Sequence, residues 1–174
     1  MKICVFGAGA VGGHLAARLA ARGHDVSVIA RGSHLAAIQK NGIKLLHGEE
    51  LIAGRVRTSD PGIQDFVIVA LKANLLDTFA DNAAPLLGRD TAVVFAQNGI
   101  PWWYGSNAKA PDLSILDPEK KLARAVDPGR VIGAVVYSAN EVIEPGVIMN
   151  HVPGNNMLVV GEADDRDSPR INNL

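Results

Sequence analysis

A glycine-rich run near the N-terminus has the spacing that a phosphate-binding turn requires. The run reads Gly7-Ala8-Gly9-Ala10-Val11-Gly12. In such a run the first glycine permits a tight turn, the second lets the backbone approach a pyrophosphate, and the third lets a helix pack closely on a strand. The helix that follows would present unpaired N–H groups and the positive end of its dipole to the anion. The run predicts a dinucleotide-binding turn, although glycine spacing alone is weak evidence because loops reach it by chance.

The residues after the second predicted strand bear on which dinucleotide would bind. NAD-binding units usually place Asp or Glu there, facing the ribose hydroxyls. Here the strand end reads Ile29-Ala30-Arg31-Gly32-Ser33 with no carboxylate, and the nearest acid, Asp25, lies at the other end of the strand. An arginine can pair with a 2′-phosphate, which a carboxylate would repel. We therefore predict NADP(H) as the cofactor, the alternative being that Arg31 is a solvated loop residue.

Two polar residues follow two buried apolar runs farther along the chain. Lys72 comes directly after residues 66–71, and Asn98 follows residues 91–96. Because ligands of doubly wound sheets lie outside the carboxyl ends of the strands, we expect both residues at one ligand. Lys72 can attract an anionic substrate or a cofactor phosphate, and Asn98 can donate and accept hydrogen bonds. Taken singly, Lys72 could equally be a solvated strand end and Asn98 an ordinary turn residue.

These residues need a sheet whose strands are joined by helices. An apolar run over residues 2–6 precedes the glycine turn, and Val11, Leu15 and Leu19 form one apolar stripe on the helix after it. Residues 25–30 follow as a second strand, which implies a parallel strand–helix–strand crossover. The runs 66–71 and 91–96 have the continuous apolar character of central parallel strands. We predict an α/β fold, a Rossmann-type doubly wound and mostly parallel sheet.

Several shorter elements are predicted between these strands. Ser33 is expected to cap a short helix that Asn41-Gly42 ends. Residues 43–46 and 51–56 are expected to pair as a hairpin or to form an irregular excursion. Residues 75–87 are predicted as a helix.

The C-terminal third predicts turns and short strands. A surface loop is expected over residues 104–116, followed by Asp117-Pro118, which reads as the cap and first residue of a short helix to about residue 126. Tight turns then separate short strands, which we expect to form an antiparallel extension of the sheet. These strands are residues 131–139, 147–151 and 157–160.

Composition and charge argue against several classes of protein. The 17 basic and 18 acidic residues leave a net charge of −1 without a long run of either sign, so neither a nucleic-acid nor an anionic-membrane surface is indicated. No apolar run approaches membrane-spanning length and no signal peptide is recognisable, so we expect a cytoplasmic protein. Cys4 reads as a buried small hydrophobic residue. The five histidines lack metal-ligand spacing, so no metal is expected.

Together these motifs resemble those of the ketopantoate reductases, the NADPH-dependent 2-dehydropantoate 2-reductases. The glycine run alone is shared by many oxidoreductases, whereas its combination with Arg31, Lys72 and Asn98 is much more specific. The resemblance covers essentially the whole chain but only the family's N-terminal, cofactor-binding domain. The segments that match in order and spacing are Gly7 to Gly12, Ile29-Ala30-Arg31-Gly32, Leu71-Lys72-Ala73, Gln97-Asn98-Gly99 and Gly133 to Ala139.

The resemblance implies a role for each matching residue. The glycine turn would hold the pyrophosphate and Arg31 the 2′-phosphate. Lys72 and Asn98 would reach the nicotinamide ribose and the substrate as the catalytic residues of this chain, and Ala139 is similar to a small residue lining the family's cofactor cleft. The implied reaction is the reduction of 2-dehydropantoate, a small 2-keto acid, to pantoate in the pantothenate and coenzyme A pathway.

Reduction of a ketone also needs a proton donor near the developing alkoxide. The family places that donor on a lysine of a helical C-terminal domain, and this sequence has no lysine after Lys121. Ser168-Pro169 reads as a helix cap followed by a first helical residue. We therefore predict an NADP-binding domain over residues 1–167 and the start of a truncated interdomain helix over residues 168–174. On this hypothesis the chain alone is inactive, and its partner is a missing C-terminal helical domain or another copy of the chain.

Three alternatives remain open from the residues. Lys72 could itself serve as the acid, the enzyme could reduce another 2-keto acid, or the chain could be a non-catalytic NADP-sensing module. The aromatic run Trp102-Trp103-Tyr104 is also open to two interpretations. It could form a wall beside the substrate or an interface, or it could pack under the loop that follows.

Overall fold

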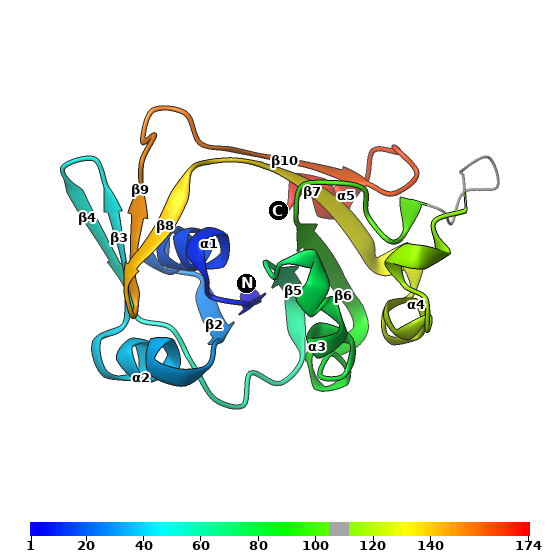
Figure 1. Cartoon of the computed structure of the whole chain (residues 1–174), viewed down its shortest axis with the longest axis horizontal. Helices are drawn as coiled ribbons and strands as arrows, with labels where there is room; N and C mark the ends of the chain where they lie inside the picture. The colour runs from blue at the N-terminus through cyan, green and yellow to red at the C-terminus, as the bar shows by residue number, and fades with distance from the viewer. Residues whose placement is uncertain (105–111) are drawn as a thin grey trace.

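The main sheet of the computed structural model, which describes residues 1–104 and 112–174, has six strands. Their order is β10-β7-β6-β5-β1-β2 (Figure 1). Adjacent strands run parallel except at the edge, where β10 is antiparallel to β7. This sheet confirms the predicted Rossmann-type fold. Its strands are β1 (Lys2–Phe6), β2 (Asp25–Ile29), β5 (Gln64–Val69), β6 (Leu87–Ala96), β7 (Val131–Tyr137) and β10 (Met157–Glu162).

Helices cover both faces of this sheet because its central strands are apolar on both sides. In β1, Ile3 and Val5 belong to the core under helix α1 (Ala10–Ala21), whereas Cys4 and Phe6 belong to the opposite core. Helices α3 (Leu76–Ala80) and α4 (Lys121–Ala125) contribute to that opposite core. Cys4 is fully buried, and burial raises the pKa of its thiol to about 11, as fits the small hydrophobic residue predicted.

The strand order places a switch point at β1. From β1 the chain moves to β2 on one side and later to β5 and β6 on the other. In open sheets of this kind the helices diverge at such a point and leave a crevice at the carboxyl ends of the strands. The crevice here lies between the ends of β1 and β5.

A second sheet lies across α1 from the main one (Figure 1), and it corrects one prediction. Of the two alternatives for residues 43–56, the structure has the hairpin. The predicted antiparallel extension of the main sheet is only partly right, because residues 147–151 leave that sheet and β7 runs parallel to β6, so that only β10 is antiparallel. The segment that leaves forms β9, which pairs parallel to β3 because Ile148 is buried against α1, with its Cδ1 only 2.5 Å from an ideal Cβ on Gly13. The strands are β4 (Glu50–Gly54), β3 (Ile43–His47), β9 (Val147–Asn150) and β8 (Asn140–Glu144), in that order.

Two predicted helices begin or end differently from expectation. Helix α2 (Gly32–Asn41) has Arg31 as its N-cap, so Ser33 lies inside the helix and does not cap it, while Gly42 ends it with φ +73° as expected. The helix predicted for residues 75–87 is broken. Pro85 lacks an N–H, and the Asn82 side chain donates to the Thr78 carbonyl (2.8 Å), so the helical turn stops early. The pieces are 3₁₀ turns Ala73–Leu75 and Ala84–Leu86 around α3.

The segment before β7 follows its predicted capping chemistry with a shift in position. The Asp117 carboxylate accepts hydrogen bonds from the N–H groups of Leu122 (3.2 Å) and Ala123 (3.0 Å) at the start of α4. The N-cap position itself is Lys120, and the helix begins at Lys121 rather than Pro118. Of the loop predicted over residues 104–116, residues 105–111 lie outside the described part. Further 3₁₀ turns are Ser114–Leu116 and Pro128–Arg130.

The two tryptophans pack in the core. Trp102 and Trp103 are each 9% exposed, and their rings lie 5.8 Å and 4.9 Å from the Phe95 ring. Of the two interpretations, this arrangement favours a packing role in the core rather than a wall beside a substrate. No helix in the described ranges is long and apolar enough to cross a membrane.

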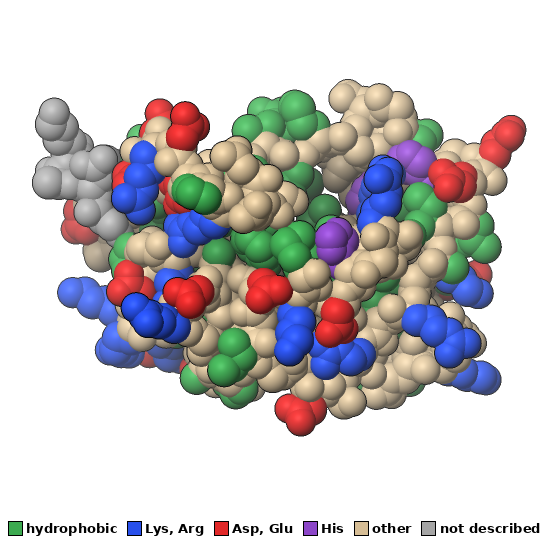
Figure 2. Space-filling view, turned by 180° about the vertical axis from the view of Figure 1, so that it is seen from behind, with side chains coloured by type: hydrophobic (Ala, Val, Ile, Leu, Met, Phe, Trp, Pro, Cys, Tyr) green, Lys and Arg blue, Asp and Glu red, His purple; other side chains and the backbone are tan. Residues whose placement is uncertain are grey.

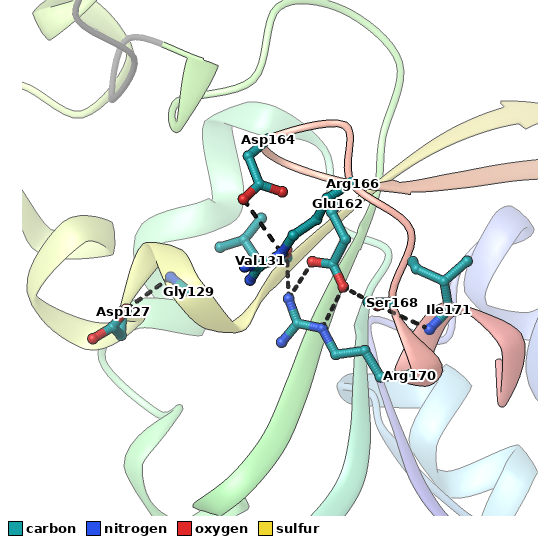
Figure 3. Close-up of polar contacts among 9 residues, drawn as sticks. All are labelled: Asp127, Gly129, Val131, Glu162, Asp164, Arg166, Ser168, Arg170 and Ile171. Carbon is teal, nitrogen blue, oxygen red and sulfur yellow. Dashed lines mark hydrogen bonds and ion pairs between the residues drawn. The ribbon is translucent and has the colours of Figure 1, made fainter.

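The C-terminal helix α5 (Pro169–Asn172) is fastened to the edge of the main sheet (Figure 3). Ser168 caps it as predicted, accepting a hydrogen bond from the Ile171 N–H (3.4 Å). The buried Glu162 carboxylate accepts from Ser168 Oγ and from Arg170 Nε (2.7 Å) and Nη2, and Arg170 also donates to the Val131 carbonyl (3.3 Å). The hydrogen bond from Arg170 lowers the pKa of Glu162.

Candidate functional site

The first glycine of the turn occupies a conformation and a space that exclude a side chain. Gly7 has φ +99°, and a Cβ there would lie 2.6 Å from Leu71 Cδ2 and 3.0 Å from the Ala70 carbonyl oxygen. The N–H groups of Gly7 and Ala8 both point back to the Ile29 carbonyl, at 3.0 Å and 3.3 Å. The end of β1 therefore turns sharply against the ends of β2 and β5.

The other two glycines of the motif have opposite surroundings. A Cβ on Gly12 would lie 2.0 Å from the Gly7 carbonyl oxygen, so the helix touches the turn backbone directly. Around Gly9, apart from its own atoms and its two chain neighbours, no atom of the described residues lies within 4 Å of an ideal Cβ. The close helix packing predicted at Gly12 is therefore present, and the space beside Gly9 is open.

Helix α1 offers backbone N–H groups at its start. The Gly13 N–H donates to the Gly9 carbonyl (2.6 Å), so the N–H groups of Gly9, Ala10, Val11 and Gly12 precede the first helical hydrogen bond. Neither an acidic residue in the first turn nor a capping side chain from the described residues competes for this end. An anion placed beside Gly9 would meet these donors and the positive end of the helix dipole.

A cleft of about 560 Å³ lies at the switch point of the sheet. Arg31 is exposed at its edge and forms the N-cap of α2 directly after β2, so its side chain can reach a group held in the cleft. Of the predicted site residues, the structure brings together Gly7, Ala8, Gly9 and Arg31 along the wall of this cleft. The wall also includes His34, Leu71, Leu75, Thr78, Asn82 and Val142, which the sequence reasoning did not select.

Lys72 and Asn98 lie at neighbouring strand ends but outside the residues that line this cleft. Gln97 Nε2 donates to the Leu71 carbonyl and so ties the end of β6 to the segment after β5. Lys72 is exposed, in extended backbone. The Asn98 amide accepts from the Val136 N–H (2.8 Å) and donates to the Val136 carbonyl (3.0 Å), continuing the β6–β7 pairing. One N–H and one lone pair of that amide remain available to a ligand.

Ala139 is exposed beyond the end of β7 and also lies outside the cleft lining. Its carbonyl accepts hydrogen bonds from the His151 N–H (2.8 Å) and from Asn150 Nδ2 (3.3 Å). These bonds fix the point where the chain leaves the main sheet for the second one. The second sheet in turn contributes Val142 of β8 to the cleft.

His34 is a cleft residue that sequence reasoning missed, having treated the histidines only as possible metal ligands. Its Nε2 lies 2.6 Å from the Ala8 carbonyl oxygen, and its Nδ1 lies 3.0 Å from the Gly146 N–H. Its position could have identified it, because the third residue after Arg31 falls on the first turn of α2 and so near the predicted cofactor site. No group of three metal-ligating side chains occurs in the described ranges.

A second hollow, of about 460 Å³, lies on the other side of α1. Figure 2 shows hydrophobic side chains within it and histidine side chains beside it. His14 is buried there with Nδ1 2.7 Å from Asn140 Oδ1, and burial lowers its pKa. Val11, Leu15, Val136, Leu158 and Leu174 line the hollow.

Comparison with known proteins gives a consistent family. The family model described as "Ketopantoate reductase PanE/ApbA" matches residues 3–165. The chain is 46% identical over 180 residues to the 2-dehydropantoate 2-reductase of Mesorhizobium japonicum, covering 98% of this chain and 55% of that protein. It is 35% identical over 150 residues to the 2-dehydropantoate 2-reductase of Pyrococcus horikoshii, covering 85% and 44%.

A solved structure from Ralstonia solanacearum, described as a ketopantoate reductase, superposes with a TM-score of 0.91 at 39% identity. The superposition covers 99% of this chain and 55% of that one. The chain thus spans about half the length of the relatives that it matches.

Proposed function

The chain belongs to the ketopantoate reductase PanE/ApbA family, and from that premise we propose that it is the NADPH-binding part of a 2-dehydropantoate 2-reductase. The observation that carries the proposal is the cleft that the glycine turn and Arg31 share. The space beside Gly9 fits a pyrophosphate at the start of α1. Arg31, with no carboxylate at the end of β2, favours a 2′-phosphate over free ribose hydroxyls.

The residues at the neighbouring strand ends suit the reaction. NADPH, when bound, supplies the hydride that reduces the 2-keto group to a hydroxyl. In our proposal Lys72 attracts the carboxylate of the keto acid, and Asn98 uses its remaining N–H and lone pair to orient the nicotinamide ribose or the substrate. Ala139, a small residue exposed beyond the end of β7, is proposed to line the cofactor cleft.

The proton donor is proposed to lie outside these 174 residues. In this division residues 1–167 form the cofactor domain, and residues 168–174 begin a helix that leads into the remaining half of the longer relatives. The hollow beside α1, whose lining is mostly apolar and includes Leu174, supports docking of such a helical domain or of a second copy of the chain. If neither is needed, Lys72 is the candidate acid.

One observation favours a different class of function. The Asn98 amide is bound to both backbone groups of Val136, so Asn98 has a structural role that needs no substrate. A non-catalytic NADP-sensing module would need the glycine turn and Arg31 alone. A reductase of another 2-keto acid is the nearer alternative, because the residues that select the substrate would belong mainly to the remaining half.

Binding measurements on this chain test the proposal. Calorimetric titration should give one NADPH per chain and weaker binding of NADH. Arg31→Ala should weaken NADPH binding at least about tenfold, because one charge-assisted hydrogen-bonded pair contributes about that much to affinity. It should change NADH binding less than about twofold. Arg55→Ala, in an exposed segment after β4, is the matched control. A chain that binds neither nucleotide would contradict the proposal.

A second measurement separates the two proposed acids. With NADPH and 2-dehydropantoate present, binding without turnover supports a proton donor outside these residues. Sustained oxidation of NADPH by this chain alone would contradict a proton donor outside these residues and would favour Lys72 as the acid.

A further inference from the structure

His34 connects three segments that meet at the cleft. It lies in the first turn of α2, its Nε2 is 2.6 Å from the Ala8 carbonyl oxygen in the glycine turn, and its Nδ1 is 3.0 Å from the Gly146 N–H between β8 and β9. A carbonyl oxygen can only accept and a backbone N–H can only donate, so these partners assign the proton of the neutral imidazole to Nε2. His34 therefore donates to Ala8 and accepts from Gly146.

The contact with Ala8 bears directly on the neighbouring N–H of Gly9. In a trans peptide the carbonyl and the following N–H point in opposite directions, and this chain has no cis peptide bond in its described residues. Holding the Ala8 carbonyl on His34 thus sets the direction of the Gly9 N–H. The Ala8 N–H is itself held by the Ile29 carbonyl (3.3 Å), so both sides of this residue are anchored to the segment around the end of β2.

The other nitrogen of His34 is anchored by the second sheet. Gly146 has φ +80°, and its carbonyl accepts from the Lys44 N–H of β3 (2.9 Å) while its own N–H donates to His34. A Cβ on Gly146 would lie 3.3 Å from Ala37 Cβ of α2, so the turn packs closely on that helix. The imidazole is therefore held in one orientation by a turn 112 residues away in sequence.

We propose that His34 is a positioning residue of the dinucleotide site, which holds the Ala8–Gly9 peptide so that the Gly9 N–H faces the pyrophosphate. This inference rests on the proposed function of the cleft and adds a residue to it. His34 acts through the peptide rather than on the ligand. It also makes the second sheet a structural support of the cofactor site.

Two substitutions separate the two hydrogen bonds of His34. The amide nitrogen of His34→Gln can replace Nε2 and keep the bond to Ala8, whereas the amide oxygen of His34→Asn can replace Nδ1 and keep only the bond to Gly146. His34→Asn should weaken NADPH binding about tenfold, and His34→Gln should stay within about threefold of the unsubstituted chain. His24→Asn, at the opposite end of β2 from the cleft, is the matched control.

A second ligand tests whether His34 acts on the turn or merely holds α2. Adenosine 2′-phosphate carries the group proposed for Arg31 but no pyrophosphate, so His34→Asn should change its affinity, measured by displacement of NADPH, less than about twofold. An equal loss of affinity for both ligands would overturn the inference in favour of a general role of His34 in α2. Unchanged NADPH binding in His34→Asn would also overturn it. So would weaker NADPH binding in His34→Gln than in His34→Asn. An unsubstituted chain that binds neither ligand would instead overturn the proposed function, and the inference with it.

Discussion

The two sides of the main sheet are held together by different means. At the glycine turn on the β1–β2 side the backbone packs on itself, with the Gly12 Cα facing the Gly7 carbonyl and two N–H groups sharing the Ile29 carbonyl. On the β6–β7–β10 side, polar side chains fasten the backbone. Asn98 pairs with Val136, and Glu162 with Arg170 secures α5.

The difference shows how each side specifies its structure. The dinucleotide turn depends on the absence of side chains at Gly7 and Gly12, because a Cβ there would meet the Leu71 side chain or the Gly7 carbonyl oxygen. The other side depends on particular side chains, each of which can be replaced at a limited cost. Substitutions on the two sides should therefore differ in size.

The largest effect is expected from Gly12→Ala. Its Cβ would lie 2.0 Å from the Gly7 carbonyl oxygen, so α1 would have to move away from the turn. We expect the free energy of unfolding to fall by at least about 3 kcal/mol, measured by urea denaturation. Gly9→Ala, where the space is open, should cost about 1 kcal/mol or less yet weaken NADPH binding. Similar stability losses for both variants would contradict the view that the tight space at Gly12 determines the cost.

Glu162→Gln should have the next largest effect. The side chain of Glu162 is 2% exposed and that of Arg170 is 28% exposed, so the substitution leaves a partly buried guanidinium without its carboxylate. We expect a loss of about 2 kcal/mol, below the cost for a fully buried pair because water reaches Arg170. Asp164→Asn, which breaks the exposed pair with Arg166, should cost only a few tenths of a kcal/mol.

The same variant predicts a pH dependence with a definite sign. Because Arg170 lowers the pKa of Glu162 in the folded chain, the stabilisation is complete above the ordinary carboxyl value of 4.5 and is lost as the pH falls through the lower folded value. The stability difference between the unsubstituted chain and Glu162→Gln should be constant above about pH 5 and shrink below about pH 4.5. A difference that grows on acidification would contradict this assignment.

Asn98→Ala should have a smaller effect. Two hydrogen bonds to Val136 are lost at an exposed position, where water can replace them, so we expect about 1 kcal/mol in urea denaturation. Asn74→Ala, at an exposed position in the turn after β5, should cost less than about 0.5 kcal/mol. If both variants are equally stable, the Asn98 amide does not fasten β6 to β7.

The smallest effect on stability is expected for Lys72→Ala. Lys72 is exposed in extended backbone, so the free energy of unfolding should change by less than about 0.5 kcal/mol. Weakened NADPH or keto-acid binding at unchanged stability would assign Lys72 to a ligand. A loss of unfolding free energy above about 1 kcal/mol would instead show that Lys72, like Asn98, has a structural role.

The sequence by itself determined the strand–turn–helix unit, the character of the main sheet and the position of Arg31. These follow from apolar periodicity and from glycines whose roles are local, so no distant contact was needed to predict them. The roles of Lys72, Asn98 and Ala139 and the division at residue 167 stay predictions.

The tertiary structure alone decided the second sheet, the anchoring of His34 by Gly146 and the pairing of Asn98 with Val136. Their partners lie 112 and 38 residues apart, and turn spacing does not say which sheet a short strand joins. β9 pairs with β3 because α1 offers Ile148 a buried position, which depends on packing between elements that are distant in sequence. The same packing brings His34 to the glycine turn, which the sequence had identified without the residue that holds it.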